Sequence, residues 1–358
     1  MSELPPNLAR LIRQDVQSMH AYAVQDARGL VKLDAMENPF PLSPTLQAEL
    51  GKRLGAVELH RYPGPRIDAL REALARYAGL PKGCALMLGN GSDELISLVA
   101  MACDTPGASI LAPLPGFVMY AMSAQLQGLK FIGVDLTPDF QLDESAMLAA
   151  IAQHQPTIIY LAYPNNPTAN LWDDAAVERI IQAAPGLVVI DEAYQPFSSR
   201  TYLDRLGKHP NVLLMRTLSK FGLAGIRLGY LMGPAALVHE IDKVRPPYNV
   251  SVLNAEAALF ALEHADVYAQ QAAQLRAERA RLIEALAAMP GVHPFPSDAN
   301  MVLVRVPQAD SVFSGMKHRG VLVKNVSKMH PLLANCLRLT VGTPAENDQM
   351  LAALQASL

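Results

Sequence analysis

Lys220 is the residue of this chain whose type and setting best suit covalent chemistry. It lies in the segment 216–222, among hydroxyl and glycine residues that follow the apolar run 212–215. A lysine amine that is removed from water loses proton affinity and can attack an aldehyde. Most lysines are simply solvated, so Lys220 taken alone does not establish an enzyme.

A carboxylate stands at the end of another apolar run. Asp191 follows 187–190, and Tyr194 comes three residues later. A buried carboxylate is costly unless a cation pairs with it, and the protonated ring nitrogen of a ligand would be such a cation. The alternative is that Asp191 caps a turn or a helix, which is the more common role of a single aspartate.

A glycine-rich loop, 89–94, joins the apolar run 86–88 to the apolar helical segment 95–102. Free backbone N–H groups at the start of such a helix bind anions, so a phosphate is the expected ligand. A simple tight connection is the alternative. The loop lacks the Lys and Ser/Thr of a Walker A motif, and Glu94 stands where the dinucleotide fingerprint has glycine.

A proline-containing loop, 163–168, follows the run 158–162 and can hold the amide of Asn166 in a fixed place. In open α/β sheets, ligands bind beyond the carboxyl ends of the strands. We therefore expect the four loops to meet at one ligand that is both anionic and ring-shaped.

The elements that position these loops follow from alternating Val- and Ile-rich runs and helical patterns. They predict an α/β fold in which a large, mostly parallel sheet lies between helix layers. Strands are predicted at 85–88, 109–112, 157–162, 187–190 and 212–215, and helices at 67–78 and 174–184.

A smaller α+β domain is predicted from the C-terminal part of the chain. Ala- and Leu-rich helices reach residue 288, strands are expected near 301–306, 321–323 and 336–341, and a helix capped by Thr343 closes the chain. The expected division is an N-terminal arm at 1–38 that contributes to the small domain, a large ligand-binding domain at 39–245 and a small domain at 246–358.

Composition excludes several other classes of protein. Of 358 residues, 51% are hydrophobic and 18% are charged, and the net charge is −3, so we expect a folded protein without nucleic-acid or membrane partners. Three dispersed cysteines favour free thiols in the cytoplasm. We find no metal-ligand spacing, signal peptide or membrane span.

Taken together and in chain order, these segments resemble fold-type I pyridoxal-phosphate aminotransferases and, within them, the histidinol-phosphate aminotransferase family. The resemblance covers nearly the whole chain. The matching segments are 36–40, 61–63, 89–96, 165–168, 191–194, 217–220, 223–229 and 337–343. It implies transamination between L-histidinol phosphate and 2-oxoglutarate, giving imidazole acetol phosphate and glutamate, in histidine biosynthesis.

The resemblance also implies roles for individual residues. Lys220 would form the Schiff base with pyridoxal phosphate and move the proton, while Asp191 would pair with the ring nitrogen. Asn166 and Tyr194 would hydrogen-bond the ring oxygen. The other implied cofactor contacts are Ser92, Asp93, Thr217, Ser219 and Arg227 around the phosphate, Phe117 stacked on the ring, and Tyr62 from the neighbouring subunit of a homodimer.

Substrate recognition is implied for Arg338, with Tyr22 and Lys324 as further candidates for the substrate phosphate. Lys324 stands where the family pattern has arginine, and Ala169 where it often has glycine. The connection from Lys220 to 223–225 is one residue shorter than in many relatives. The alternatives left open are an aromatic amino acid aminotransferase, a threonine-phosphate decarboxylase and, from another class, a non-catalytic cofactor-sensing module.

Overall fold

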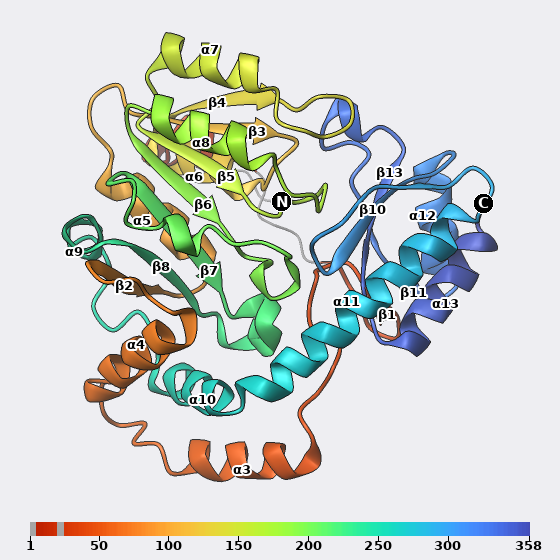
Figure 1. The fold of residues 1–358 in the computed structure, drawn as a ribbon, viewed down its shortest axis with the longest axis horizontal. Coiled ribbons are helices and arrows are strands. Elements are labelled where there is room, and N and C mark those ends of the chain that lie inside the picture. Colours follow the sequence, from red (N-terminus) through yellow and green to blue (C-terminus); the bar gives the residue numbers. More distant parts are fainter. Residues whose placement is uncertain (1–4, 20–24) are drawn as a thin grey trace.

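A seven-stranded sheet forms the centre of the computed structural model, which describes residues 5–19 and 25–358 (Figure 1). Its strand order is β2-β8-β7-β6-β5-β3-β4. The strands are β2 (Cys84–Gly89), β3 (Ser109–Leu114), β4 (Lys130–Asp135), β5 (Ile158–Ala162), β6 (Leu187–Asp191), β7 (Val212–Thr217) and β8 (Gly229–Pro234). Neighbouring strands are parallel except around β8, which runs antiparallel to β2 and β7. The predicted α/β fold is confirmed.

Helices cover both faces of this sheet because its central strands are apolar on both sides. In β6, Val188 and Ile190 pack into one layer and Val189 into the other. The first layer contains α4 (Pro65–Ala78), α7 (Glu144–His154), α8 (Asp174–Ala183) and α10 (Val252–Glu263); the second contains α5 (Ser92–Ala102), α6 (Met119–Gln127) and α9 (Ala235–Asp242). Within the described ranges, no helix has the length and apolar character needed to cross a membrane.

A smaller four-stranded antiparallel sheet has the order β12-β13-β10-β9. Its strands are β9 (His293–Pro294), β10 (Met301–Arg305), β12 (Lys324–Asn325) and β13 (Cys336–Thr340), and it packs with α11 (Ala265–Ala287), α12 (Ala309–His318) and α13 (Pro344–Gln355). Thr343 and Glu346 form the reciprocal capping box at the start of α13, as the sequence predicts.

The N-terminal part of the chain spans both regions. The short helices α1 (Pro6–Ala9) and α2 (Gln14–Gln17) precede β1 (Val31–Lys32), which pairs in parallel with β11 (Val321–Leu322) beside the smaller sheet (Figure 1). The next helix, α3 (Pro44–Gly55), packs against α10, which also packs against α4. The chain between β1 and α3 therefore passes from the smaller region to the larger one.

Candidate active site

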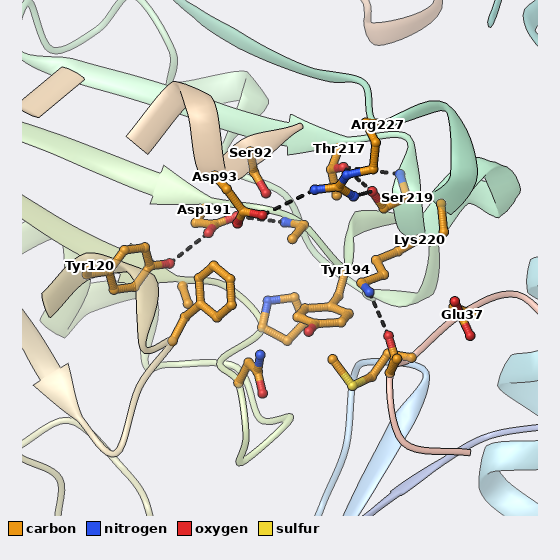
Figure 2. A pocket seen from close by; sticks show the side chains of 18 of the residues that line it. Glu37, Ser92, Asp93, Tyr120, Asp191, Tyr194, Thr217, Ser219, Lys220 and Arg227 are labelled. Carbon is orange, nitrogen blue, oxygen red and sulfur yellow. Dashed lines mark hydrogen bonds and ion pairs between the residues drawn. The ribbon is translucent and has the colours of Figure 1, made fainter. Parts of the chain in front are cut away.

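A cavity of about 330 Å³ opens at the carboxyl ends of β5, β6 and β7. Ten of the residues predicted for the site line it together: Ser92, Asp93, Phe117, Asn166, Asp191, Tyr194, Thr217, Ser219, Lys220 and Arg227 (Figure 2). They come from separate loops, so the fold brings together the four segments that the sequence singled out.

Lys220 lies on an irregular helical turn, Ser219–Leu223, which follows β7 and is kinked at Gly222. Gly222 makes this turn possible because its φ is 139° and a Cβ atom there would lie 2.8 Å from the ring of Tyr268. The shortened connection still brings Arg227 to the cavity.

The amine of Lys220 lies at the cavity wall, and the residue is partly buried. Its Nζ donates a hydrogen bond to the carbonyl oxygen of Ala35 at 2.8 Å, which is visible in Figure 2. Burial, together with the nearby positive charge of Arg338, lowers the pKa of Lys220 to about 8. The neutral, nucleophilic amine is therefore available near pH 8.

This shift predicts the pH dependence of Lys220 reactivity in the cofactor-free protein. Acylation by trace acetic anhydride, read by peptide mass spectrometry, should rise with pH through a midpoint near 8, because only the neutral amine reacts. The same peptide labelled in denaturant serves as the control and should titrate near the ordinary lysine value of about 10.4. Coincident midpoints in the two states would contradict the assignment.

Asp191 lies at the end of β6 with both carboxylate oxygens hydrogen-bonded. The Tyr120 hydroxyl donates to Oδ2 at 2.7 Å, and the Ala193 backbone N–H donates to Oδ1 at 3.0 Å. Burial raises the pKa of Asp191 to about 6, whereas these two donors lower it. A buried carboxylate that faces a cavity in this way can stabilise a cation placed there.

Another part of the cavity, around the start of α5 and Arg227, is suited to an anion. Helix α5 begins at Ser92 without a side-chain cap, so the first-turn N–H groups point toward the cavity end. Arg227 donates to Ser219 Oγ at 3.3 Å and forms an ion pair with Asp93 at 3.2 Å (Figure 2). The Ser219 backbone N–H in turn donates to Thr217 Oγ1.

Close backbone approach keeps this anion cradle open. Gly91 has a φ of 85°, and a Cβ atom at this position would lie 2.8 Å from Nη2 of Arg227. A side chain there would occupy the space that an anion needs beside the guanidinium. The residues present therefore fit a phosphate at this end, a protonated ring nitrogen near Asp191 and an aldehyde near Lys220.

Two of the predicted substrate residues, Arg338 and Lys324, lie on neighbouring strands of the smaller sheet, outside the cavity lining. Arg338 is buried and donates hydrogen bonds to Asn166 Oδ1 and to the Asp34 carbonyl oxygen, both at 2.7 Å. Lys324 is the register partner of Arg338 on the adjacent antiparallel strand, so both side chains project from the same face of the sheet.

The structure does not bring every predicted residue to this cavity. Tyr62 is 75% exposed and stacks on Tyr248, with ring centroids 4.2 Å apart, outside the cavity lining. Tyr22 lies outside the described residues.

Sequence reasoning missed Tyr120, Ala35 and Glu37, all of which line the cavity. Glu37 belongs to the matching segment 36–40 and Ala35 directly precedes it. Neither residue type indicates a contact with Lys220. Tyr120 follows Phe117 by three residues in a helical stretch, and that spacing was the one available signal.

Ala169 is a position where the sequence departs from the family pattern, and the departure has a structural cost. The φ of Ala169 is 65°, in the left-handed region that favours glycine. A left-handed conformation costs a residue with a Cβ atom roughly 1 kcal/mol. The Ala169 carbonyl accepts from Asp298 N–H, and its N–H donates to Asn165, so tertiary contacts hold this strained conformation.

Comparison with known proteins identifies the family. The class I and II aminotransferase model matches residues 28–354. Histidinol-phosphate aminotransferase of Methylibium petroleiphilum is 74% identical, covering 99% of this chain and 96% of that protein; the enzyme of Polaromonas naphthalenivorans is 70% identical, covering 100% and 99%. The crystal structure of histidinol-phosphate aminotransferase from Sinorhizobium meliloti in complex with pyridoxal-5′-phosphate is 26% identical, with a TM-score of 0.84 and 96% coverage of each chain.

The chain therefore belongs to the class I and II aminotransferase family. Within that family it belongs with the histidinol-phosphate aminotransferases, to which its similarity extends over the full length. The predicted family is thus confirmed.

Proposed function

We propose that this protein catalyses transamination between L-histidinol phosphate and 2-oxoglutarate with pyridoxal 5′-phosphate as cofactor. The observation that carries the proposal is one cavity holding the amine of Lys220 with its lowered pKa, the buried carboxylate of Asp191 and the cationic Arg227. The 74% identity to a histidinol-phosphate aminotransferase supports the choice of substrate.

The cofactor, when bound, supplies an electron sink that stabilises negative charge at the substrate Cα. Lys220 Nζ would hold the cofactor, and as a free amine the same nitrogen would take the substrate Cα proton and return it. The Ala35 carbonyl, 2.8 Å from Nζ, gives the released amine a fixed position.

The remaining cavity residues hold the cofactor ring and its phosphate. Asp191 would keep the ring nitrogen protonated, and Asn166 and Tyr194 would bind the ring oxygen. Phe117 supplies an aromatic face that fixes the ring plane. The phosphate would lie against the N–H groups of Ser92 and Asp93, the hydroxyls of Thr217 and Ser219, and the guanidinium of Arg227.

Substrate anions would bind at the small-sheet edge. Arg338 and Lys324 lie opposite one another on neighbouring strands, so that their two positive charges would both attract an anion bound at this face of the sheet. Arg338 can hold a carboxylate with two parallel hydrogen bonds, whereas Lys324 offers a point charge. We assign Arg338, Lys324 and, outside the described residues, Tyr22 to substrate recognition.

Parallel half-reactions test the substrate. Loss of the visible absorbance of the lysine-bound cofactor on adding L-histidinol phosphate, L-phenylalanine or L-threonine phosphate should be fastest by far with histidinol phosphate. Faster conversion by phenylalanine would leave an aminotransferase but overturn the substrate. Release of carbon dioxide from threonine phosphate would favour the decarboxylase alternative.

Lys324→Met tests the substrate site, and Lys328→Met is its matched control. Lys324→Met should raise KM for histidinol phosphate about 10-fold, which is typical for loss of one charged hydrogen bond. Lys328 lies on the same segment but pairs with Asp310 at the surface, so its variant should leave KM unchanged. Equal effects of the two substitutions would remove Lys324 from the substrate site.

A homodimer in which Tyr62 reaches the neighbouring cavity is part of the proposal. Two large aromatic side chains, Tyr62 and Tyr248, stack on each other while 75% and 55% exposed, and exposed aromatic pairs are typical of protein interfaces. In such a dimer, the partner's Tyr62 hydroxyl would join Arg227, Thr217 and Ser219 in binding the cofactor phosphate.

Mixed dimers test where Tyr62 acts. Co-expressed Lys220→Ala and Tyr62→Ala chains, each nearly inactive alone, should regain about a quarter of wild-type activity, since half of the dimers carry one intact site. If Tyr62 served its own subunit, no intact site would form and activity would not return.

We also propose a cytoplasmic location. The structure leaves Cys84, Cys103 and Cys336 as free thiols, a state that reducing compartments maintain. Alkylation of protein from freshly lysed cells should modify all three in denaturant without prior reduction.

A further inference from the structure

Tyr120 is a buried residue of α6 whose position is fixed by its aromatic neighbours. Its ring stacks on Tyr160 with centroids 4.4 Å apart and planes at 8°, and it meets Phe117 edge-on at 5.6 Å. In this arrangement its hydroxyl donates to Asp191 Oδ2 at 2.7 Å (Figure 2). The hydrogen bond therefore does not depend on a mobile side chain.

The hydroxyl meets a carboxylate that needs help to stay ionised. Burial raises the pKa of Asp191, and the negative charges of Asp93 and Glu192 raise it further. The hydrogen bonds from Tyr120 and from the Ala193 N–H act in the opposite direction. Burial also raises the pKa of Tyr120, so its hydroxyl stays protonated and donates to the anionic form of Asp191.

We propose that Tyr120 is a positioning residue that holds Asp191 as an oriented anion facing the ring nitrogen of the cofactor. The inference rests on the cofactor assignment in the proposed function. It adds a residue that acts through Asp191, and it predicts that the contribution of Tyr120 to cofactor binding depends on a nitrogen atom in the cofactor ring.

The chain provides a matched control for this proposal. Tyr160 is the other member of the stacked pair and is equally buried, but its hydroxyl donates to the Ile96 carbonyl at 3.4 Å rather than to Asp191. Tyr120→Phe and Tyr160→Phe remove the same atom from neighbouring rings. A general effect of losing a buried hydroxyl should appear in both variants.

Cofactor affinity is the first measurement. Dissociation constants for pyridoxal phosphate and for its 1-deaza analogue, which has carbon in place of the ring nitrogen, are compared in wild type and both variants. Tyr120→Phe should weaken pyridoxal phosphate binding about 10-fold, as expected for one hydrogen bond to a charged group, and change deaza-analogue binding less than about twofold. Tyr160→Phe should change neither more than about twofold.

Dependence on Asp191 is the second measurement. In an Asp191→Asn background, adding Tyr120→Phe should no longer change affinity for pyridoxal phosphate, because the anion that the hydroxyl supports is gone. The nitrogen-15 resonance of labelled cofactor should show a less protonated ring nitrogen in Tyr120→Phe than in wild type. Both readouts are independent of transamination activity.

The outcomes separate this inference from the proposed function. Wild-type protein that binds no pyridoxal phosphate would overturn the function. Wild-type binding together with equal weakening of both cofactors by Tyr120→Phe would overturn only the role of Tyr120. If Tyr120→Phe folds poorly, Tyr120→Leu and Tyr120→His replace it. The leucine variant lacks a hydrogen-bond donor and the histidine variant has one. Only Tyr120→His should keep the tighter binding of pyridoxal phosphate relative to the deaza analogue.

Discussion

Replacing Lys220 with alanine should lower kcat for transamination by at least about 10⁴-fold, the upper range for loss of a general base. The substitution removes both the attachment point and the group that moves the Cα proton. Lys220→Arg keeps the positive charge but should be similarly inactive, because a guanidinium is neither nucleophilic nor deprotonated in proteins. Single-turnover absorbance measurements separate the chemical step from cofactor loss.

Added primary amines provide the control for this loss. The cavity left in Lys220→Ala should admit methylamine or ethylamine, which can act as the proton-transferring base, and activity should rise with amine basicity. Borohydride treatment of the loaded wild-type protein should fix the cofactor to the peptide that contains Lys220. Attachment to another lysine, or full activity of Lys220→Ala, would overturn the assignment.

Replacing Glu192 with glutamine should destabilise the protein by about 3–5 kcal/mol, the usual cost of leaving one member of a buried ion pair. The side chains of Glu192 and Arg216 are 1% and 6% exposed, and Arg216 Nη2 lies 2.8 Å from Glu192 Oε2. The Thr201 hydroxyl and the Tyr202 backbone N–H both donate hydrogen bonds to the other carboxylate oxygen of Glu192, Oε1. The guanidinium of Arg216 would therefore remain buried without its counter-charge.

Thermal unfolding measures this cost, with an expected fall in melting temperature of about 5–10 °C. Glu144→Gln is the matched control, because Glu144 pairs with Arg179 at the surface, where ion pairs contribute at most about 1 kcal/mol. A double change of Glu192 to leucine and Arg216 to methionine should recover part of the lost stability. Equal melting temperatures of Glu192→Gln and Glu144→Gln would contradict the prediction.

This buried pair also affects the active site. Glu192 follows Asp191 in the sequence, and Arg216 precedes Thr217, so the pair fastens the ends of β6 and β7 together next to two cavity residues. Loss of the pair should therefore loosen the strand ends that carry Asp191 and Thr217, whereas removal of the Glu192 charge should by itself lower the pKa of Asp191.

The sequence predicted the strands whose apolar runs are continuous, including β5, β6 and β7, since burial on both faces leaves an unambiguous pattern. It missed β4, an edge strand with alternate residues exposed, and β8, which has glycine within and at the start of its run. The start of α4 was placed two residues late because Gly64, its N-cap residue, has no side chain to signal the cap.

Site residues were predictable where polar side chains follow apolar strands, as with Asp191 and Lys220. Tyr120 was not, because it lies in an apolar helix and resembles a core residue until its partner, 71 positions away, is placed beside it. Arg338 and Asn166 were both predicted as site residues, but the hydrogen bond between them, across 172 positions, was not. Such pairings depend on tertiary structure, which local patterns do not encode.

The parallel pairing of β1 with β11 has a consequence for synthesis on the ribosome. Val31 emerges about 290 residues before its partner Val321. At 5–20 residues per second, the N-terminal strand waits roughly 15–60 s for the segment that completes its sheet. The Ala35 carbonyl that accepts the hydrogen bond of Lys220 lies just after this strand. The large sheet can therefore form early, whereas the Ala35 carbonyl takes its final position beside Lys220 only near the end of translation.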